Sequence, residues 1–493
     1  MTNSDVIVAQ LQATARTDQC RNVFFKQSEL KALHDALRSN ASQIKEAIQK
    51  DTSVSSSEAR TEVAVALSIV KDHYQSLDPK KELEYEYRTS KGIDTLDRRE
   101  PWGLVYIEPD LRHTPFLSVI APLSAAIAAG NCVLLKLESS LRQIPALLRT
   151  ILPPALSQNS FAAITSTPNQ NVLQECLEVV QTPSNDIQPQ NTHLVSANAS
   201  VVAVVDRSAD LIAAAEHLAA ARFALRGTSR YAPDIVLVNE FVKKEFLEAL
   251  IRSAIPYITT QSNQANGSAS KPKDHVAAQL ESLKSNANWH SNVITSGQLG
   301  AIVDLTSKTN KIVSIPDKIS APVLAVSTFT SLEHAIDLAT ASGRLSAAYF
   351  FAEAAHAKYL DQYVASEVSF VNHVPAQLLL GPIAPLFHPF DLEKRYTVEH
   401  FTRAAPAFAS QSTNKASEQV RRALNGDVKS GQALLDAATQ PIQEAKRAEW
   451  IALGFFEQGI FIGLGVYGLP LLGCIGASLF YGVRFGLRKF AIL

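Results

Sequence analysis

Cysteine is scarce in this chain of 493 residues, and none of its four cysteines, at positions 20, 132, 176 and 474, lies in a CxxC pair. A disulfide framework or a structural zinc site needs paired spacing, so neither is encoded, and a reducing compartment fits best. An excess of either charge is also lacking, because 46 Lys and Arg stand against 47 Asp and Glu. With a formal net charge of -1, no overall field draws the chain to nucleic acid. The sequence therefore excludes a stapled scaffold and a general nucleic-acid binder.

Glycine is rare in most of the chain. Eleven glycines lie in the first 450 residues, about 2.4%, whereas average usage is about 7%. The other nine lie between Gly454 and Gly486. The body also has no GxGxxG, P-loop, HExxH or GxSxG motif. Few positions therefore allow the backbone to approach a phosphate closely, and the C-terminal tail is a different kind of structure.

That tail contains one long run without charge. Residues 459–483, GIFIGLGVYGLPLLGCIGASLFYGV, are 25 consecutive uncharged residues. A helix of this length rises about 37 Å, more than the roughly 30 Å of a hydrocarbon core. Glu457 precedes the run, basic residues at 484–489 follow it, and Pro470 near its middle could kink the helix. A buried soluble helix is the alternative, but core helices rarely run uncharged beyond about 18 residues.

The position of this run predicts its topology. Only ten residues follow it, and the N-terminus MTNSDVIVAQLQATARTDQC has no apolar signal core. We therefore expect a single-pass C-terminal membrane anchor, inserted after synthesis, with the folded body in the cytosol. The basic residues after the span are compatible with the endoplasmic reticulum, the mitochondrial outer membrane or the peroxisome.

The body reads as an α/β protein. Residues 1–95 are predicted to be helical, with an amphipathic period in SELKALHDALRSNASQIKEAIQKD. Residues 96–195 hold strands WGLVYIEP and CVLLKLE around a short apolar helix. Residues 196–404 hold strands such as VVAVVD, DIVLVNE, APVLAVSTF and LSAAYFFAE, with a helix expected to end at Gly227 and a loop at SNQANGSASKPKD. Residues 405–450 are polar and Ala-rich, as expected of a helical stalk.

Several segments resemble the aldehyde dehydrogenase superfamily. TPFLSVIAPLSAAIAAGNCVLLKLESS is similar to that family's N-Y-P-F turn and its A-I-A-A-G-N-A-V-V-L-K-P-S-E run, and RGTSRYAPDIVLV is similar to the G-Q-T-C-V-A-P-D segment around its nucleophile. VVDRSADL and APVLAVSTFTSLEHAIDLA match further segments, in family order, from about residue 15 to 405. The hydrophobic tail resembles the membrane-bound fatty-aldehyde branch. The resemblance implies a nucleotide-binding-type domain, a second α/β domain, a C-terminal transmembrane helix and a homodimer.

The resemblance also implies that the catalytic positions are replaced. Counting back from APD, Arg230 stands where the family has its cysteine nucleophile, and a guanidinium offers no nucleophilic lone pair. Ser196 stands at the position of the general base and His113 at that of the oxyanion-binding asparagine. A shift of one residue would supply Ser229 as nucleophile, but the match through Gly227 opposes it and no adjacent base is evident. His113 could still donate a hydrogen bond to an oxyanion.

The cofactor positions are altered as well. The F-T-G-S-T-x-V-G segment that places a helix N-terminus at the pyrophosphate has no counterpart between Pro154 and Ser196, where the chain is some ten residues short. The glutamate that contacts the nicotinamide ribose falls at Lys318. Lys136, in KLES, is the one residue retained that could contact a nucleotide. We therefore expect no cofactor and no metal.

Three functions remain open from the sequence. The first is a catalytically inactive, membrane-tethered scaffold, partner subunit or binder of an apolar ligand. The second is an active NAD(P)-dependent dehydrogenase of fatty or other apolar aldehydes, which would require a different register. The third is another reaction in the same cleft, with His113, Arg230 or Tyr231 as candidate groups. Strands and helices are retained where reactive groups are lost, and this favours the first.

Overall fold

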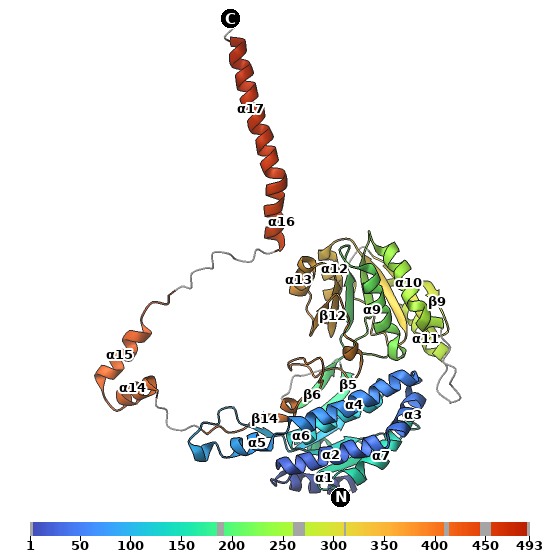
Figure 1. The fold of residues 1–493 in the computed structure, drawn as a ribbon, viewed down its shortest axis with the longest axis vertical. Helices are drawn as coiled ribbons and strands as arrows, with labels where there is room; N and C mark the ends of the chain where they lie inside the picture. Colours follow the sequence, from blue (N-terminus) through green and yellow to red (C-terminus); the bar gives the residue numbers. More distant parts are fainter. Residues whose placement is uncertain are drawn as a thin grey trace. The chain divides into compact units, whose positions relative to one another are not determined.

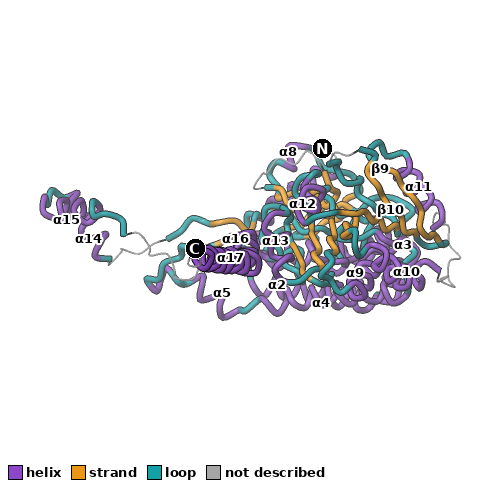
Figure 2. Tube along the Cα trace, turned by 90° about the horizontal axis from the view of Figure 1, so that it is seen from above, coloured by secondary structure: helices purple, strands orange, loops and turns teal. Residues whose placement is uncertain are grey.

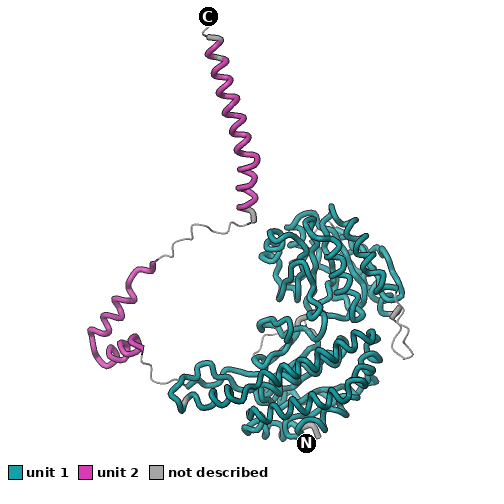
Figure 3. The backbone as a smooth tube through the Cα atoms, viewed as in Figure 1, with its two compact units in different colours: residues 1–410 teal, residues 411–493 magenta. Residues whose placement is uncertain are grey.

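The computed structural model describes residues 3–184, 192–259, 272–309, 312–408, 414–443 and 455–490. The chain forms two compact units, Met1–Ser410 and Gln411–Leu493 (Figure 3). The first unit contains a parallel sheet and a mostly parallel sheet, each with helices packed on it. The elements described in the second unit are all helices (Figures 1 and 2).

Five helices open the first unit: α1 (Asn3–Ala15), α2 (Val23–Ser39), α3 (Ala41–Thr52), α4 (Ser56–Ser76) and α5 (Pro79–Glu86). Asn22 caps α2 by accepting the Phe24 and Phe25 amides, and Ser55 and Glu58 form a capping box on α4. The leucines at positions 30, 33 and 37 lie at helical spacing and are fully buried. The apolar period therefore predicted this part of the core.

The first sheet has five parallel strands in the order β4-β3-β2-β5-β6. They are β2 (Leu104–Glu108), β3 (Cys132–Lys136), β4 (Phe161–Ile164), β5 (Leu177–Ser184) and β6 (His193–Ala197), with helices α6 (Pro115–Ala129), α7 (Gln143–Ala155) and α8 (Gln170–Leu173). Helices α2–α4, α6 and α7 contribute to one core, and α1 packs with the opposite face of the sheet. Strand order reverses between β2 and β5, the place where doubly wound folds bind ligands.

The second sheet has seven strands in the order β13-β12-β7-β8-β11-β10-β9, parallel except for the β9–β10 pair. The strands are β7 (Val201–Val205), β8 (Ile235–Asn239), β9 (Trp289–Ser296), β10 (Ala301–Ser307), β11 (Val323–Phe329), β12 (Ala347–Phe351) and β13 (Ser369–Val371). Helices α9 (Leu211–Phe223) and α10 (Lys243–Thr259) cover one face. The other face packs against α11 (Pro272–Lys284), α12 (Leu332–Thr340) and α13 (Ala354–Tyr363).

Short elements complete the first unit. Strands β1 (Arg99–Pro101) and β14 (Thr402–Ala404) form an antiparallel pair. The 3₁₀ turns are η1 (Thr89–Lys91), η2 (Ala224–Gly227), η3 (Ala376–Leu379) and η4 (Val398–Phe401).

Two local predictions were wrong. The helix expected to end at Gly227 ends at Phe223, because Leu225 and Arg226 adopt left-handed conformations with φ of 51° and 58°. Their tertiary contacts explain this: the Leu225 amide donates to Glu58 and the Arg226 guanidinium donates to the Ser53 carbonyl. The expected loop SNQANGSASKPKD already enters α11 at Pro272, and residues 260–271 lie outside the described residues. Strand β10 was not among the predicted strands, although AIVDLTS follows a glycine and is rich in β-branched residues.

The second unit contains α14 (Lys415–Leu424), α15 (Val428–Ala438), α16 (Phe455–Gly463), η5 (Leu464–Gly468) and α17 (Leu469–Phe490). Residues 457–485 form one helix long and apolar enough to span a membrane, with mean hydropathy 2.0 and none of its most apolar window buried. Pro470 does not interrupt this helix. The π-helical turn η5 precedes it, which fits a proline whose ring excludes the ordinary bond to the carbonyl four residues earlier.

Candidate functional site

The candidate site lies where the two halves of the first unit meet. Residues 109–114 leave the carboxyl end of β2 and lead into α6, and residues 228–234 lead into β8 of the second sheet. Hydrogen bonds and an ion pair join the two loops. Arg230 and His113 therefore lie on two loops that contact each other.

Arg230 is held by an acidic partner rather than exposed in a cleft. Its Nη2 lies 3.3 Å from Oδ2 of Asp110, and the exposed fractions of the two side chains are 13% and 10%. Arg112 also pairs with Asp110, at 2.9 Å. Burial alone would raise the pKa of Asp110, but hydrogen bonds and charge from Arg112, with the charge of Arg230, outweigh it and lower that pKa. Asp110 is therefore an ionised anchor for Arg230 at neutral pH.

Lys318 binds the loop at residues 228–234 through its ammonium group. Its ammonium donates to the backbone carbonyl of Arg230 at 2.6 Å and to Oδ2 of Asp234 at 2.9 Å. Burial lowers the pKa of Lys318, and the Asp234 charge opposes this shift. The residue at the ribose-contacting position of the family thus points into the protein and fixes the position that would carry the nucleophile.

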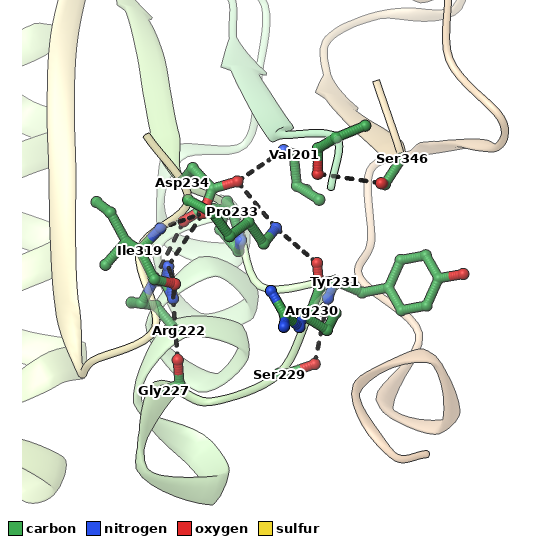
Figure 4. Close-up of polar contacts among 12 residues, drawn as sticks. Val201, Arg222, Gly227, Ser229, Arg230, Tyr231, Pro233, Asp234, Ile319 and Ser346 are labelled. Atoms are coloured by element: carbon green, nitrogen blue, oxygen red, sulfur yellow. Dashed lines mark hydrogen bonds and ion pairs between the residues drawn. The ribbon is translucent and has the colours of Figure 1, made fainter. Parts of the chain in front are cut away.

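Asp234 is the centre of a buried polar cluster (Figure 4). Besides Lys318 it accepts the Val201 and Ile319 amides, at 2.8 and 3.0 Å, and pairs with Arg222 at 3.5 Å. The Arg222 side chain has no exposed surface, and it also donates to the carbonyls of Gly227, Pro233 and Ile319.

The cluster holds two buried cations against one carboxylate, and backbone carbonyls satisfy the remaining donors. This is the pattern of a structural clamp on residues 227–234.

His113 is fully engaged. Its Nδ1 lies 2.9 Å from Thr228 Oγ1, and its Nε2 lies 2.9 Å from the Leu379 carbonyl oxygen. Burial lowers the pKa of His113 to about 4, so the ring is neutral at pH 7. Because Nε2 must donate to the carbonyl, Nδ1 faces the Thr228 hydroxyl as an acceptor, and that hydroxyl shares its one proton between Nδ1 and the Leu225 carbonyl at 2.8 Å. Both ring nitrogens are occupied, so neither is available to an oxyanion.

The serine candidates lack a base. Ser196 lies on β6, and its buried hydroxyl has no hydrogen-bond partner within the described residues. Ser229 is buried and accepts the Tyr231 amide at 3.4 Å. The Tyr231 ring points away from the Asp234 cluster, and its hydroxyl accepts the Ala384 amide at 3.0 Å (Figure 4). Neither serine therefore has the adjacent proton acceptor that would activate a hydroxyl.

The switch point of the first sheet is occupied by side chains of the protein. The buried Gln181 of β5 accepts the Asp110 amide at 3.0 Å and donates to the Ser118 carbonyl of α6 at 2.8 Å. Lys136, at the end of β3, donates to Glu108 of β2 and to Thr167, both at 2.9 Å. These bonds connect the carboxyl ends of the strands between which a dinucleotide would lie.

The residues present do not fit NAD(P). Lys318 is turned inward, Lys136 already has a carboxylate partner, and Gln181 bridges the switch point. Only residues 185–192 separate β5 from β6, whereas a strand–helix–strand crossover needs at least about ten to twelve residues. Residues 185–191 of this connection lie outside the described residues.

The cysteines of the first sheet do not lie at this site. Cys132 begins β3 and Cys176 directly precedes β5, so both lie at the amino ends of the strands, opposite the site. The described residues contain no group of three or more side chains able to hold a metal ion. Within the described residues, the polar side chains of this site bind one another and the adjoining loops.

Sequence reasoning missed Asp110, Thr228 and Gln181. One signal for Asp110 was available, since about two extra residues precede His113 relative to the family pattern and an acidic residue in that insertion complements Arg230. Thr228 and Gln181 had none, because their partners lie 115 and 71 residues away in the sequence.

Comparison with known proteins gives one family. Residues 2–152 match the sequence profile described as "Aldehyde dehydrogenase family". The chain is similar to the 4,4'-diaponeurosporen-aldehyde dehydrogenase of Staphylococcus aureus, with 24% identity over 73% of this chain and 82% of that protein. It is also similar to aldehyde dehydrogenase family 3 member B1 of Mus musculus, with 32% identity over 31% of this chain and 34% of that protein. The match to the same protein of Rattus norvegicus, at 27% identity, covers 49% of this chain and 54% of its length.

Solved structures give the same fold. The substrate-bound AldH of Staphylococcus aureus superposes with a TM-score of 0.67 at 20% identity, covering 88% of this chain and 100% of that one. A NAD-dependent benzaldehyde dehydrogenase from Corynebacterium glutamicum superposes with a TM-score of 0.59 at 17% identity, over 83% and 89% of the two chains. At these identities the likeness concerns the fold.

Proposed function

The chain carries a domain of the aldehyde dehydrogenase family, and from that premise we propose that it is a non-catalytic, membrane-tethered member that acts through association with other proteins. In this proposal the fold provides a stable surface for other proteins, and the residues at the family's reaction site stabilise the fold. The C-terminal helix holds this surface at a membrane, with the body in the cytosol.

One observation carries the proposal: the loop that would bear the nucleophile is fixed by its own buried ion pairs. Arg230 pairs with Asp110, and Lys318 binds both the Arg230 carbonyl and Asp234. In this proposal the bonds hold the nucleophile position within the protein. Leaving a buried charge without its partner costs about 3–5 kcal/mol. The arrangement supports a structural role for the positions that perform chemistry in the family.

The membrane assignment rests on the second unit. The helix at 457–485 has the length and hydropathy of a span, and its side chains are exposed in the isolated chain. Such a surface is not stable in water without a partner, and a lipid bilayer supplies one. A full-length chain expressed in cells should remain with membranes after alkaline extraction, whereas a chain that ends at residue 443 should be released. Release of both forms would refute the tether.

Active aldehyde oxidation is the second candidate, and one observation favours it. The Staphylococcus aureus relative, whose name is that of an aldehyde dehydrogenase, is matched over 82% of its length. If the chain shares that activity, its nucleophile cannot be at Arg230. Ser229 is then the nearest hydroxyl in the loop.

Turnover separates the two candidates. Purified full-length protein in nanodiscs is incubated with long-chain aldehydes and NAD or NADP, and formation of the reduced cofactor is followed by its absorbance at about 340 nm. We expect no rate above that of the matched control variant Ser229→Ala. A rate in the wild-type chain that Ser229→Ala removes, while the exposed-site variant Arg207→Ala keeps it, would establish dehydrogenase activity and overturn the proposal.

Association is tested on the same material. The resemblance predicts a homodimer, and the wider proposal predicts a protein partner. Mass photometry of the protein in nanodiscs should give more than one copy per particle, or should do so after a partner captured from cytosol is added. Particles with a single copy and no captured protein would contradict the scaffold proposal.

A further inference from the structure

Two buried cysteines meet at the amino end of the first sheet. Cys20 lies in the turn between α1 and α2, and Cys132 is the first residue of β3. Their sulfur atoms are 3.6 Å apart, and the two side chains have almost no exposed surface. Both are free thiols. No sequence pattern indicated this pair, because the two residues are separated by 112 positions and lie in no paired motif.

We propose that Cys20 and Cys132 form a reversible disulfide when hydrogen peroxide or another small peroxide reaches them, and that the bond locks α1 to the sheet. A sulfur separation of 3.6 Å closes to the roughly 2.05 Å of a disulfide by small rotations of the two side chains. In a reducing compartment the pair rests as two thiols, and a bond that forms transiently is the usual redox use of cytosolic cysteines.

The backbone around the pair is already in contact. The Cys132 amide donates to the Gly103 carbonyl at 2.8 Å, which fixes one partner in the sheet. A Cβ at Gly130 would lie 2.8 Å from the Cys20 carbonyl oxygen, so a glycine there lets the two segments approach closely. Cys20 itself lies in a turn, where residue 21 bonds back to residue 18, and this side can adjust.

A small cavity borders Cys20. It has a volume of about 10 Å³, which is about the space of one water molecule, and it is lined by Cys20, Lys26, Glu29, Asn131 and Ser160 among others. Its polar groups can bond a peroxide as they bond water, and because a peroxide has two oxygen atoms where water has one, entry requires the turn around Cys20 to move.

The hydrogen bond between the sulfurs divides their roles. It lowers the pKa of Cys20 and raises that of Cys132, because one thiolate accepts from the other thiol. The Cys20 thiolate attacks one peroxide oxygen, the O–O bond breaks, and the leaving hydroxide takes a proton and departs as water. The Cys132 thiol then attacks the resulting sulfenic acid, and a second water leaves as the S–S bond forms. In total, two thiols and one hydrogen peroxide give one disulfide and two waters.

Peptide mapping of the full-length protein tests this inference directly. The protein in nanodiscs is treated with hydrogen peroxide, alkylated and digested without reductant. We expect a linked peptide pair containing Cys20 and Cys132, lost on addition of dithiothreitol. Cys176 is the internal control, because it is also buried and burial raises its pKa to about 12. Cys20 should react at least about tenfold faster than Cys176.

Thermal unfolding gives an independent readout. Oxidation should raise the unfolding temperature of wild type and of Cys176→Ala by about 5 °C, because the bond closes a loop of more than 100 residues. It should not raise that of Cys20→Ser. If Cys20→Ser fails to fold, the mapping of wild-type protein decides alone. Equal oxidation of Cys20 and Cys176, or conversion of Cys20 to a sulfinic acid without a link to Cys132, would overturn the inference.

Discussion

Restoring the family residue at position 318 should destabilise this protein instead of restoring a cofactor site. In Lys318→Glu the ammonium that bonds Asp234 at 2.9 Å and the Arg230 carbonyl at 2.6 Å becomes a carboxylate. Its new neighbours are a second carboxylate and a carbonyl oxygen, which both repel it. The exposed fraction of the Lys318 side chain is 7% and that of Asp234 is 0%, so water screens this repulsion very little.

The size of the effect follows from these contacts. Losing the Lys318 ammonium costs about 1–3 kcal/mol because Asp234 keeps three other donors, and placing a second buried carboxylate beside Asp234 brings the expected loss to about 5 kcal/mol or more. Unfolding entropy of about 2 cal/mol/K per residue gives roughly 0.8 kcal/mol/K for a unit of about 400 residues. The unfolding temperature should therefore fall by about 6 °C.

Differential scanning calorimetry of the full-length protein measures this shift. Lys358→Glu is the matched control, because it makes the same charge reversal on an exposed face of α13, and it should shift the unfolding temperature by less than about 1 °C. The reasoning is refuted if Lys318→Glu is as stable as Lys358→Glu, and most clearly if it also acquires NAD or NADP binding.

Other consequences of the structure can be measured on the same material. Asp234→Ala leaves two buried cations without a carboxylate and should reduce the free energy of unfolding by about 3–5 kcal/mol. Lys318→Met should reduce it by about 1–3 kcal/mol, because Asp234 keeps three donors. Calorimetry measures both losses. Burial raises the pKa of Glu62 from 4.5 to about 7, so this group stabilises the fold at low pH and that contribution is lost as the pH rises through 7. In Glu62→Gln the unfolding temperature should accordingly change less with pH between about 4.5 and 7, where the group is worth about 3 kcal/mol. Burial lowers the pKa of His113 from 6.5 to about 4, so the neutral ring stabilises the fold above pH 6.5 and this stabilisation is lost as the pH falls through 4. In His113→Gln the unfolding temperature should therefore fall less between pH 6.5 and 4 than it does in wild type. Leu472→Arg places a charge near the middle of the span and should release part of the protein from membranes in an alkaline extraction assay.

The elements that repeat a simple period could be predicted from the sequence. The leucines of α2 mark a helix by their spacing, and the strand at residues 104–108 is an apolar run after a turn. The APD motif before β8 predicts Arg230 at the nucleophile position, with Ser229 as the alternative if the register shifts by one residue. These features depend on residues that are close in sequence, so they could be predicted from a single sequence.

The internal bonds of the site depend on distant residues and could not be predicted in this way. Lys318 reaches Asp234 across 84 positions, and Arg230 reaches Asp110 across 120. The sequence indicated that a lysine would oppose a ribose hydroxyl, but not that it would bind the loop of the former nucleophile. The end of α9 was misplaced for the same reason, since Glu58 and Ser53 hold the residues after Phe223.

Binding of the dinucleotide tests the central claim most directly. By this claim, Lys318 and Gln181 bond within the protein at positions where the family binds the cofactor. Isothermal titration of the full-length protein in nanodiscs with NAD and with NADP should give no saturable heat up to about 1 mM. A saturable signal with a Kd of about 10 μM or tighter, weakened by a substitution at Lys136 or Gln181, would contradict that claim.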